Sequence, residues 1–324
     1  MPSASVVICT HDRVEMLGRA VEHALAELRG AEGELLVVDN ASSDGTPALV
    51  EELARRHAPR LRAVREPRLG LSVARNRALA AAAGEVVVFL DDDAVPRAGW
   101  LAALAQPYRA REVACVGGPV RLYFPEPPPP WLVPELHPTF SAFDLGGEPR
   151  RLRYGHDDYP YGANISFRTA AARAAGGFCA SLGVRGAVEL LHEETDLCYR
   201  LERDGGAVEY APDAIVDHWV PPERLTPERV LRRHELAGRS AAVFVLRNRG
   251  LLRALWRIRW LYARRLLAVP YTPRAPIDPA RLLRECRRRE AVGYLAGLAR
   301  ALPKSRALRR EALAAPPLPA EGAA

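Results

Sequence analysis

The sequence predicts an α/β protein, with an open mixed sheet and flanking helices followed by a basic helical extension. Over residues 4–93, short apolar runs alternate with stretches of helical periodicity, which is the pattern of a doubly wound sheet. The uninterrupted run at residues 86–90 is too short to span a membrane and is typical of a strand buried on both faces. Beyond residue 223 the chain holds 23 Lys and Arg against 7 Asp and Glu, whereas residues 1–223 hold 23 against 32. This division predicts an acidic body held against an anionic partner by a basic tail.

The first half of the chain contains regular elements. Strands are expected at residues 5–10, 34–39, 61–66 and 86–90, because each run is short and rich in β-branched or apolar residues. One helix is expected after the turn at residues 11–13 and ends near residue 29. Two more are expected over residues 47–57 and over an alanine-rich stretch that ends at Gly84. The polar cluster after Asp39 has loop composition, and Asp44 or Thr46 can cap the helix that follows it.

The second half is less regular. A helix is expected over residues 100–111 and a strand over residues 113–117, before prolines at 125–136 exclude the interior of a helix or sheet. That segment is either a plain linker or a semi-rigid loop over a cleft, and Trp131 favours the loop. A strand and a helix are expected within residues 161–178, a helix over 195–203, and a single strand over 207–217 that ends at His218.

The remainder, residues 224–324, is expected to be helical and is rich in arginine. Over residues 251–269, Leu, Trp, Ile and Tyr are interleaved with five arginines. Such a helix either lies in a membrane interface or packs on the protein as an ordinary amphipathic helix. No recognised nucleic-acid motif accompanies the positive charge, so we do not expect nucleic acid to be the partner.

Cysteines and targeting signals restrict the location. The five cysteines are scattered and form no CxxC pair, which predicts neither a disulfide framework nor a zinc site. No secretion signal is recognised at the start, and no uncharged apolar segment is long enough to cross a membrane. We therefore expect a cytoplasmic protein, placed at the inner face of the cell membrane where its basic tail contacts lipid.

Three aspartates follow the strand at residues 86–90. In extended backbone Asp91 and Asp93 project to one side and Asp92 to the other. Ligands of open α/β sheets collect at the carboxyl ends of strands, and paired carboxylates suit Mg²⁺ or Mn²⁺. The alternative is an acidic turn that caps the next helix, near Ala98.

Five segments, in order and at plausible intervals, resemble the inverting glycosyltransferases of family 2, which have a GT-A fold. They are SVVICTHDR, VVDNASSDGT, RLGLSVARNRALAAAAGEVVVFLDDDAVP, GANISFR and HEETDLCYRL. The resemblance covers about residues 4–220. It implies a GT-A domain over residues 1–223, with a nucleotide-sugar half (1–118) and an acceptor half (119–223), followed by the basic region.

The resemblance implies roles on the donor side. Asp39 resembles the residue that reads uracil or thymine, so a UDP- or dTDP-sugar is favoured, although guanine stays open. Thr10 and Asp12 would flank the nucleotide pocket, and Arg75 would counter the charge of the diphosphate. The alternatives are a loop cap for Asp39 and a surface ion pair for Arg75.

The resemblance also implies a metal centre. Asp93 resembles the direct ligand of Mg²⁺ or Mn²⁺, and Asp91 the residue that holds ribose or metal, while Asp92 would belong to the nucleotide-sugar site. His218 resembles a histidine that contacts metal or diphosphate in some members, and its alternative is a purely structural role. The metal would offset the charge that builds on the leaving diphosphate.

On the acceptor side, Gly162, Ala163 and Asn164 resemble the strand start that borders the acceptor, with a small residue leaving room for a sugar. The family's Glu-Asp-x-Asp-Leu pattern has Glu194 in place of its second residue, so either Glu194 or Glu193 is the expected catalytic base. Asp196 is expected to cap or anchor the helix. The alternative for both glutamates is a first-turn position with only helix-dipole stabilisation.

These observations predict an inverting, metal-dependent transfer of a sugar to an acceptor hydroxyl on a glycan, a lipid-linked molecule or a small molecule. One rival is a phosphatase of the haloacid dehalogenase type with Asp91 as nucleophile, but it needs a lysine near the phosphate and Lys304 is the only lysine. Another is a non-catalytic protein that binds nucleotide sugars. A Rossmann dehydrogenase is excluded because no GxGxxG follows the first strand.

Overall fold

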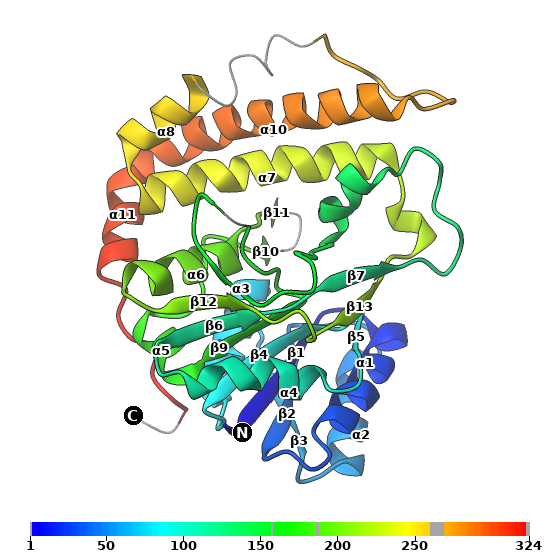
Figure 1. Cartoon of the computed structure of the whole chain (residues 1–324), viewed down its shortest axis with the longest axis vertical. Helices are drawn as coiled ribbons and strands as arrows, with labels where there is room; N and C mark the ends of the chain where they lie inside the picture. Colours follow the sequence, from blue (N-terminus) through cyan, green and yellow to red (C-terminus); the bar gives the residue numbers. More distant parts are fainter. Residues whose placement is uncertain (1, 157, 186–187, 260–268, 322–324) are drawn as a thin grey trace.

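The structure is a computed structural model that describes residues 2–156, 158–185, 188–259 and 269–321. Its centre is an eight-stranded sheet in the order β3-β2-β1-β4-β9-β6-β12-β8 (Figure 1). In chain order these strands are β1 Ala4–Thr10, β2 Gly33–Asp39, β3 Leu61–Arg65, β4 Val86–Asp91, β6 Val113–Gly117, β8 Arg150–Leu152, β9 Asn164–Arg168 and β12 Ala207–Tyr210.

The register of the sheet brings several strand ends to one edge. Strands β1 to β4 are parallel, and Thr10 lies opposite Asp39 while Cys9 lies opposite Asp91. Strand β9 is antiparallel to both β4 and β6, which makes the sheet mixed, as expected from the sequence. Because β4 is buried on both faces, its only polar residue, Asp91, comes at its carboxyl end.

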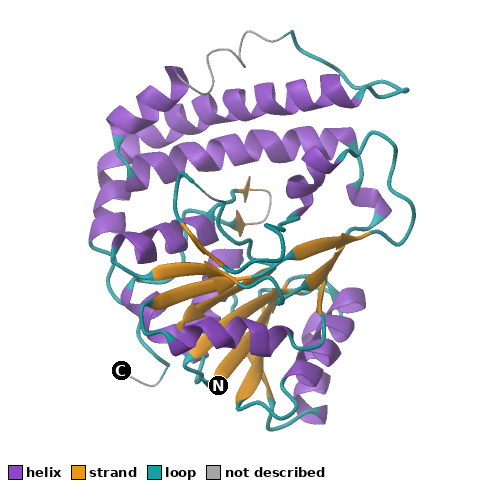
Figure 2. Ribbon diagram, in the orientation of Figure 1, coloured by secondary structure: helices purple, strands orange, loops and turns teal. Residues whose placement is uncertain are grey.

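Helices cover both sides of this sheet (Figure 2). They are α1 Val14–Glu27, α2 Thr46–Arg56, α3 Leu71–Ala81, α4 Trp100–Ala105, α5 Thr169–Ala174 and α6 Glu193–Arg203. The helix expected over residues 100–111 is shorter than predicted. It ends at Ala105 and continues as the 3₁₀ turn η1 Gln106–Arg109, since Pro107 has no N–H to donate to an α-helical bond.

The single strand expected over residues 207–217 is wrong. Strand β12 ends at Tyr210, and a separate strand, β13 Val216–Trp219, lies in a three-stranded sheet between β5 Ala94–Pro96 and β7 Val120–Tyr123. The turn between them contains Pro212, which cannot donate to a strand ladder. This change of sheet pairs His218 with Ala94, immediately after the three aspartates. A short hairpin, β10 Val184–Arg185 and β11 Val188–Glu189, precedes α6.

The proline-rich segment is packed against the protein and is not a free linker. Trp131, Leu132 and Leu136 are buried, and the segment continues into the 3₁₀ helix η2 Pro134–Phe140. These side chains share one hydrophobic cluster with Val230 and Leu282 of the C-terminal helices.

The basic region forms the helices α7 Pro227–Asn248, α8 Leu251–Arg257, α10 Pro279–Ala301 and α11 Ser305–Leu313. The long helices α7 and α10 lie side by side (Figure 1). Glycines allow this approach: a Cβ on Gly293 would lie 1.9 Å from the carbonyl oxygen of Glu235, and a Cβ on Gly238 would lie 2.0 Å from that of Glu290. Only the first part of the helix expected over residues 251–269 can be compared, since residues 260–268 lie outside the described residues.

After α11 the chain returns to the sheet domain as a strap, residues 314–321. The N–H of Leu318 donates to the carbonyl oxygen of Arg173, and the N–H of Glu321 donates to that of Ala80. Leu318 packs against the main core, and a Cβ on Gly176 would lie 2.8 Å from the Cβ of Ala315. Among the described helices, none is both long and apolar enough to cross a membrane.

The contact between α7 and α10 gives a first prediction. Gly293→Ala should lower the free energy of unfolding by about 1–3 kcal/mol, because the added methyl group forces the two backbones apart. Urea unfolding followed by far-UV circular dichroism measures the change. Gly18→Ala in α1 is the matched control, since nothing lies within 4 Å of its added Cβ. Equal stability of wild type and Gly293→Ala would contradict the packing described here.

Candidate functional site

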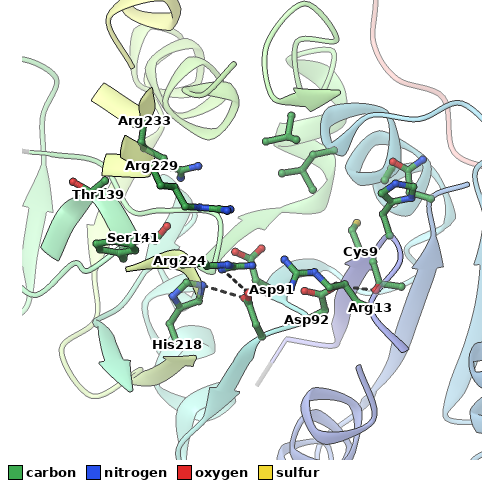
Figure 3. Close-up of a pocket in the computed structure, with 18 of the residues that line it drawn as sticks. Cys9, Arg13, Asp91, Asp92, Thr139, Ser141, His218, Arg224, Arg229 and Arg233 are labelled. Carbon is green, nitrogen blue, oxygen red and sulfur yellow. Dashed lines mark hydrogen bonds and ion pairs between the residues drawn. The ribbon is translucent and has the colours of Figure 1, made fainter. Parts of the chain in front are cut away.

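A cavity of about 620 Å³ opens where β1, β2 and β4 end. The loops after these strands form one wall, and η2, η3 Pro222–Arg224 and α7 form the other (Figure 3). Its polar lining residues are Thr10, His11, Arg13, Asn40, Asp91, Asp92, Asp93, Thr139, Ser141, His218, Arg224, Arg229 and Arg233.

Asp91, Asp93 and His218 form a cluster that could hold a metal ion. One carboxylate oxygen of each aspartate and one ring nitrogen of His218 all lie within 4.8 Å of one another. His218 Nε2 lies 3.0 Å from Asp93 Oδ1, and Arg224 Nη1 lies 3.0 Å from Asp93 Oδ2. Burial favours the protonated form of Asp93, but the hydrogen bond from His218 and the charge of Arg224 outweigh it and lower its pKa. Two carboxylates and an imidazole suit a hard divalent cation and leave positions for further oxygen ligands.

Asp92 and Asp93 lie in the turn between β4 and β5 and not in the extended backbone that the sequence predicted, and Asp92 is bonded outside the cluster. Its Oδ2 accepts a hydrogen bond of 2.7 Å from Thr10 Oγ1, which joins the ends of β1 and β4. Burial raises the pKa of Asp92 to about 7, and the charge of Asp93 adds to that effect. The alternative that the aspartates cap the next helix is wrong, because Gly99 occupies the N-cap position of α4 and no side chain caps it.

The predicted nucleotide residues lie around the loops after β1 and β2. Thr10 lines the cavity, whereas Asp39 is buried and its Oδ1 accepts a hydrogen bond from the N–H of Ser42. Asp12 is exposed and accepts from the N–H of Ser43, which ties the two loops together. Asn40, which the sequence did not single out, lines the cavity and receives a hydrogen bond from the N–H of Gly70.

Arg75 is buried, contrary to the alternative of a surface ion pair. Its Nη1 donates to Glu193 Oε1 at 2.9 Å, and its Nη2 lies 3.5 Å from Asp91 Oδ1. The guanidinium carbon lies 5.7 Å and 5.5 Å from the ring centroids of Phe89 and Phe178. Arg75 therefore connects the metal cluster to α6 through buried contacts.

Two expectations for the acceptor side need correction. A Cβ on Gly162 would lie 2.1 Å from Arg75 Nη2, so the guanidinium fills the room that was expected to receive a sugar. Asn164 is fully buried, and its amide bonds to Trp100 Nε1 and to the carbonyl oxygens of Pro119 and Ala214. Ala163 is also buried, at 1% exposure. None of these three residues is among those that line either cavity.

The two glutamates of α6 differ in their surroundings. Glu193 is buried against Arg75, and burial together with the nearby Glu194 raises its pKa despite that partner. Glu194 lines a second cavity of about 210 Å³, and its Oε2 is buried without a hydrogen-bond partner among the described residues. Asp196 is fully buried and anchors α6 to α7, because Arg247 Nε lies 3.0 Å from its Oδ1.

The second cavity adjoins the first. Thr139, Ser141 and Arg233 line both of them. Two of the surrounding residues have left-handed backbone, Ser141 with φ of 68° and His192 with φ of 73°, a conformation that costs energy in residues other than glycine. Such strain is often found at functional sites.

Sequence reasoning missed the residues of the far wall, which come from η2, η3 and α7. Thr226 accepts a hydrogen bond from the N–H of Arg229 at the start of α7, and Pro227 occupies the first turn. That cap, followed by Arg229 and Arg233 one helical turn apart, was a signal that these arginines share a helix face. Nothing in the sequence indicated which cavity that face meets.

Comparisons with known proteins agree with this geometry. The family described as "Glycosyl transferase family 2" matches residues 5–175. The chain is 28% identical over 254 residues to the succinoglycan biosynthesis protein ExoM of Rhizobium meliloti, covering 78% of each protein. It is 31% identical over 248 residues to the pre-mycofactocin glycosyltransferase of Mycobacterium tuberculosis, covering 75% of this chain and 48% of that protein.

A solved structure shares the fold. The mannosyltransferase PcManGT from Pyrobaculum calidifontis, solved in complex with GDP-Man and Mn²⁺, has a TM-score of 0.56 and 20% sequence identity. The match covers 97% of this chain and 80% of that one, so it includes most of the C-terminal helices.

The raised pKa of Asp92 gives a second prediction. The unfolded carboxyl has an ordinary pKa near 3.8 and the folded one a pKa of about 7, so its stabilising contribution is complete below about pH 4 and is lost as the pH rises to 7. Asp92→Asn should therefore gain about 1–3 kcal/mol of stability relative to wild type between pH 5 and pH 8. Urea unfolding in EDTA measures this gain. The exposed Asp213→Asn is the control, and a pH-independent difference for Asp92→Asn would refute the prediction.

Proposed function

Because this chain belongs to glycosyl transferase family 2 and has the GT-A fold, we propose that it is an inverting, metal-dependent glycosyltransferase. Glycosyltransferase activity on nucleotide-sugar donors follows from the family. Beyond that activity, we propose that the transfer inverts the anomeric configuration, that it requires a divalent cation, and that specific residues of this chain carry it out. One observation carries the proposal: Glu194, whose buried Oε2 has no hydrogen-bond partner among the described residues, lines a cavity that adjoins the one with Asp91, Asp93 and His218.

The larger cavity would take the nucleoside diphosphate. Thr10 and Asn40 line the part near the ends of β1 and β2, with Asp39 adjacent, and a UDP- or dTDP-sugar stays the favoured donor. Arg13 and Arg224 line the same cavity and would counter the charge of the diphosphate. The solved mannosyltransferase complex holds GDP-Man, so a guanine nucleotide belongs in any donor screen.

Asp91, Asp93 and His218 would hold the divalent cation, Mg²⁺ or Mn²⁺. When bound, such a cation supplies Lewis-acid stabilisation of the leaving diphosphate. Arg224, which pairs with Asp93, keeps that carboxylate ionised and oriented toward the cavity. Arg75 contacts Asp91 from the buried side and holds it in place.

Glu194 would act as the general base. In a direct displacement the acceptor oxygen forms a bond to the anomeric carbon while the bond to the diphosphate breaks, and the hydroxyl proton passes to Glu194 Oε2. A buried carboxylate oxygen without a partner is available to accept that proton. Glu193, already bonded to Arg75, would instead position α6 and the metal cluster.

The two alternative functions, a phosphatase and a non-catalytic binding protein, are less well supported. A phosphatase with Asp91 as nucleophile needs a lysine at the phosphate, but Lys304 lies exposed in η5 Leu302–Lys304, beyond α10, and does not line the cavity. A non-catalytic binding protein has no need for Glu194 beside the larger cavity with a buried carboxylate oxygen that lacks a partner among the described residues.

We also propose that the protein contacts an anionic membrane surface at the inner face of the cell membrane, through α8. Leu251, Leu252, Leu255 and Trp256 lie on one face of that helix and are 43%, 84%, 48% and 52% exposed. The surrounding region carries 23 Lys and Arg against 7 Asp and Glu, which complements anionic headgroups. Apolar side chains next to positive charge are typical of helices that lie in a membrane interface.

The catalytic proposal predicts the effect of Glu194→Gln. Transfer should fall by two or more orders of magnitude, because the amide cannot take the proton, while affinity for UDP with Mn²⁺ changes little. Steady-state rates with a panel of UDP-, dTDP- and GDP-sugars, together with titration of UDP, separate the two effects.

The exposed Glu223→Gln is the matched control and should keep full turnover. Near-full turnover of Glu194→Gln combined with an inactive, folded Glu193→Gln would move the base to Glu193. Activity in both variants would exclude a carboxylate base on α6.

The membrane proposal predicts that Leu252→Glu with Trp256→Glu weakens binding to vesicles of phosphatidylglycerol and phosphatidylcholine at least about tenfold. Co-sedimentation at low and high salt measures it. Leu313→Glu, at an exposed position on α11, is the control. Equal sedimentation of the double variant and wild type would exclude α8 as the contact.

A further inference from the structure

A basic face of α7 lies beside the proposed catalytic base. Arg233 is half-buried and lines both cavities, and Arg229, one turn earlier, is exposed and lines the larger one (Figure 3). Among the described residues, no hydrogen-bond or ion-pair partner of Arg233 is found, so its guanidinium can bind a ligand at the junction of the two cavities.

The side chains around Arg233 place it on the acceptor side. Burial is the main influence on the pKa of Tyr161, which is raised, and of His192, which is lowered; the charge of Arg233 acts to lower both pKa values, and the charge of Glu194 acts to raise them. Arg233, Glu194, Tyr161 and His192 therefore surround one space, the smaller cavity. An in-line displacement puts the attacking oxygen and the leaving diphosphate on opposite sides of the anomeric carbon, so a group beside Glu194 lies on the acceptor's side.

The rest of the smaller cavity suits a sugar. Hydroxyl groups come from Thr139, Ser141, Tyr161 and Thr195, and His192 has a buried Nδ1 without a hydrogen-bond partner among the described residues. Hydroxyls and imidazoles can both donate and accept, as the hydroxyls of a sugar require. Among the described residues of this lining, and apart from the proposed base, Arg233 is the only one that is always charged.

We propose that the acceptor carries a phosphate group, which Arg233 binds at the junction of the two cavities with Arg229 at the rim, while the acceptor's sugar hydroxyl meets Glu194. This inference rests on the proposed function and adds the acceptor class. A planar guanidinium binds phosphate oxygens through two parallel hydrogen bonds, which makes arginine suited to this task. The phosphate could belong to a soluble sugar phosphate or to a lipid-linked sugar.

The test uses the full chain with its donor side filled by UDP and Mg²⁺, and isothermal titration with glucose 1-phosphate as the probe. We expect wild type to bind glucose 1-phosphate, and Arg233→Gln to weaken that binding about tenfold or more while UDP affinity is unchanged. Arg232→Gln is the matched control, since Arg232 is exposed on the same helix and lines neither cavity. Glucose, which lacks the phosphate, should bind wild type and Arg233→Gln equally.

Farnesyl phosphate in detergent micelles distinguishes the two sources. Tighter binding of farnesyl phosphate than of glucose 1-phosphate, lost in Arg233→Gln, supports a lipid-linked acceptor, and the reverse order supports a soluble one. Equal binding of both probes by wild type and Arg233→Gln overturns the inference. So does a parallel loss of UDP affinity in Arg233→Gln, because Arg233 would then belong to the donor. Failure of wild type to bind any of UDP, dTDP and GDP would instead refute the proposed function.

Discussion

The buried carboxylate of Asp196 joins α6 and α7, the two helices that carry Glu194 and Arg233. It is fully buried, and it receives Arg200 at 2.9 Å on one oxygen and both Arg247, at 3.0 Å, and Asn248, at 2.7 Å, on the other. A buried charge is tolerated only when its partners satisfy it, and removing one of several partners is strongly destabilising. Because Asp196 belongs to α6 and Arg247 to α7, this interaction fixes the helix that carries Glu194 against the helix that carries Arg233.

The far wall of the larger cavity depends on residues that lie outside the sheet. Trp131 and Leu136 pack with Val230 and Leu282, so the proline-rich segment is held between the sheet domain and the C-terminal helices. That packing places Thr139 and Ser141 at both cavities. The basic region after residue 223 therefore contributes residues to the cavities themselves and is not only a support for the sheet domain.

Local patterns predicted most of the sheet and the position of Asp91 and Asp93 at its edge. An apolar run of one strand length followed by aspartates is sufficient to place Asp91 and Asp93 at a strand end, and β4 confirms it. His218 was expected there only by resemblance, and its position depends on a change of sheet at Pro212 that the alternating pattern does not reveal. Gly162 shows a second limit of prediction from sequence. A glycine indicates that another group lies close to the backbone, but only the fold shows that this group is the Arg75 guanidinium and not a ligand.

The strap over residues 314–321 has a consequence for biosynthesis. It covers Gly176 and Gly177 and bonds to Arg173 and Ala80, which are made much earlier in translation. Domains generally fold from the amino-terminal end as they emerge from the ribosome. The sheet domain can therefore form while this surface of α3 and α5 is still uncovered. The strap can cover this surface only after residues 314–321 have been synthesised. A nascent chain stalled within the basic helices would therefore expose the surface to solvent and to chaperones.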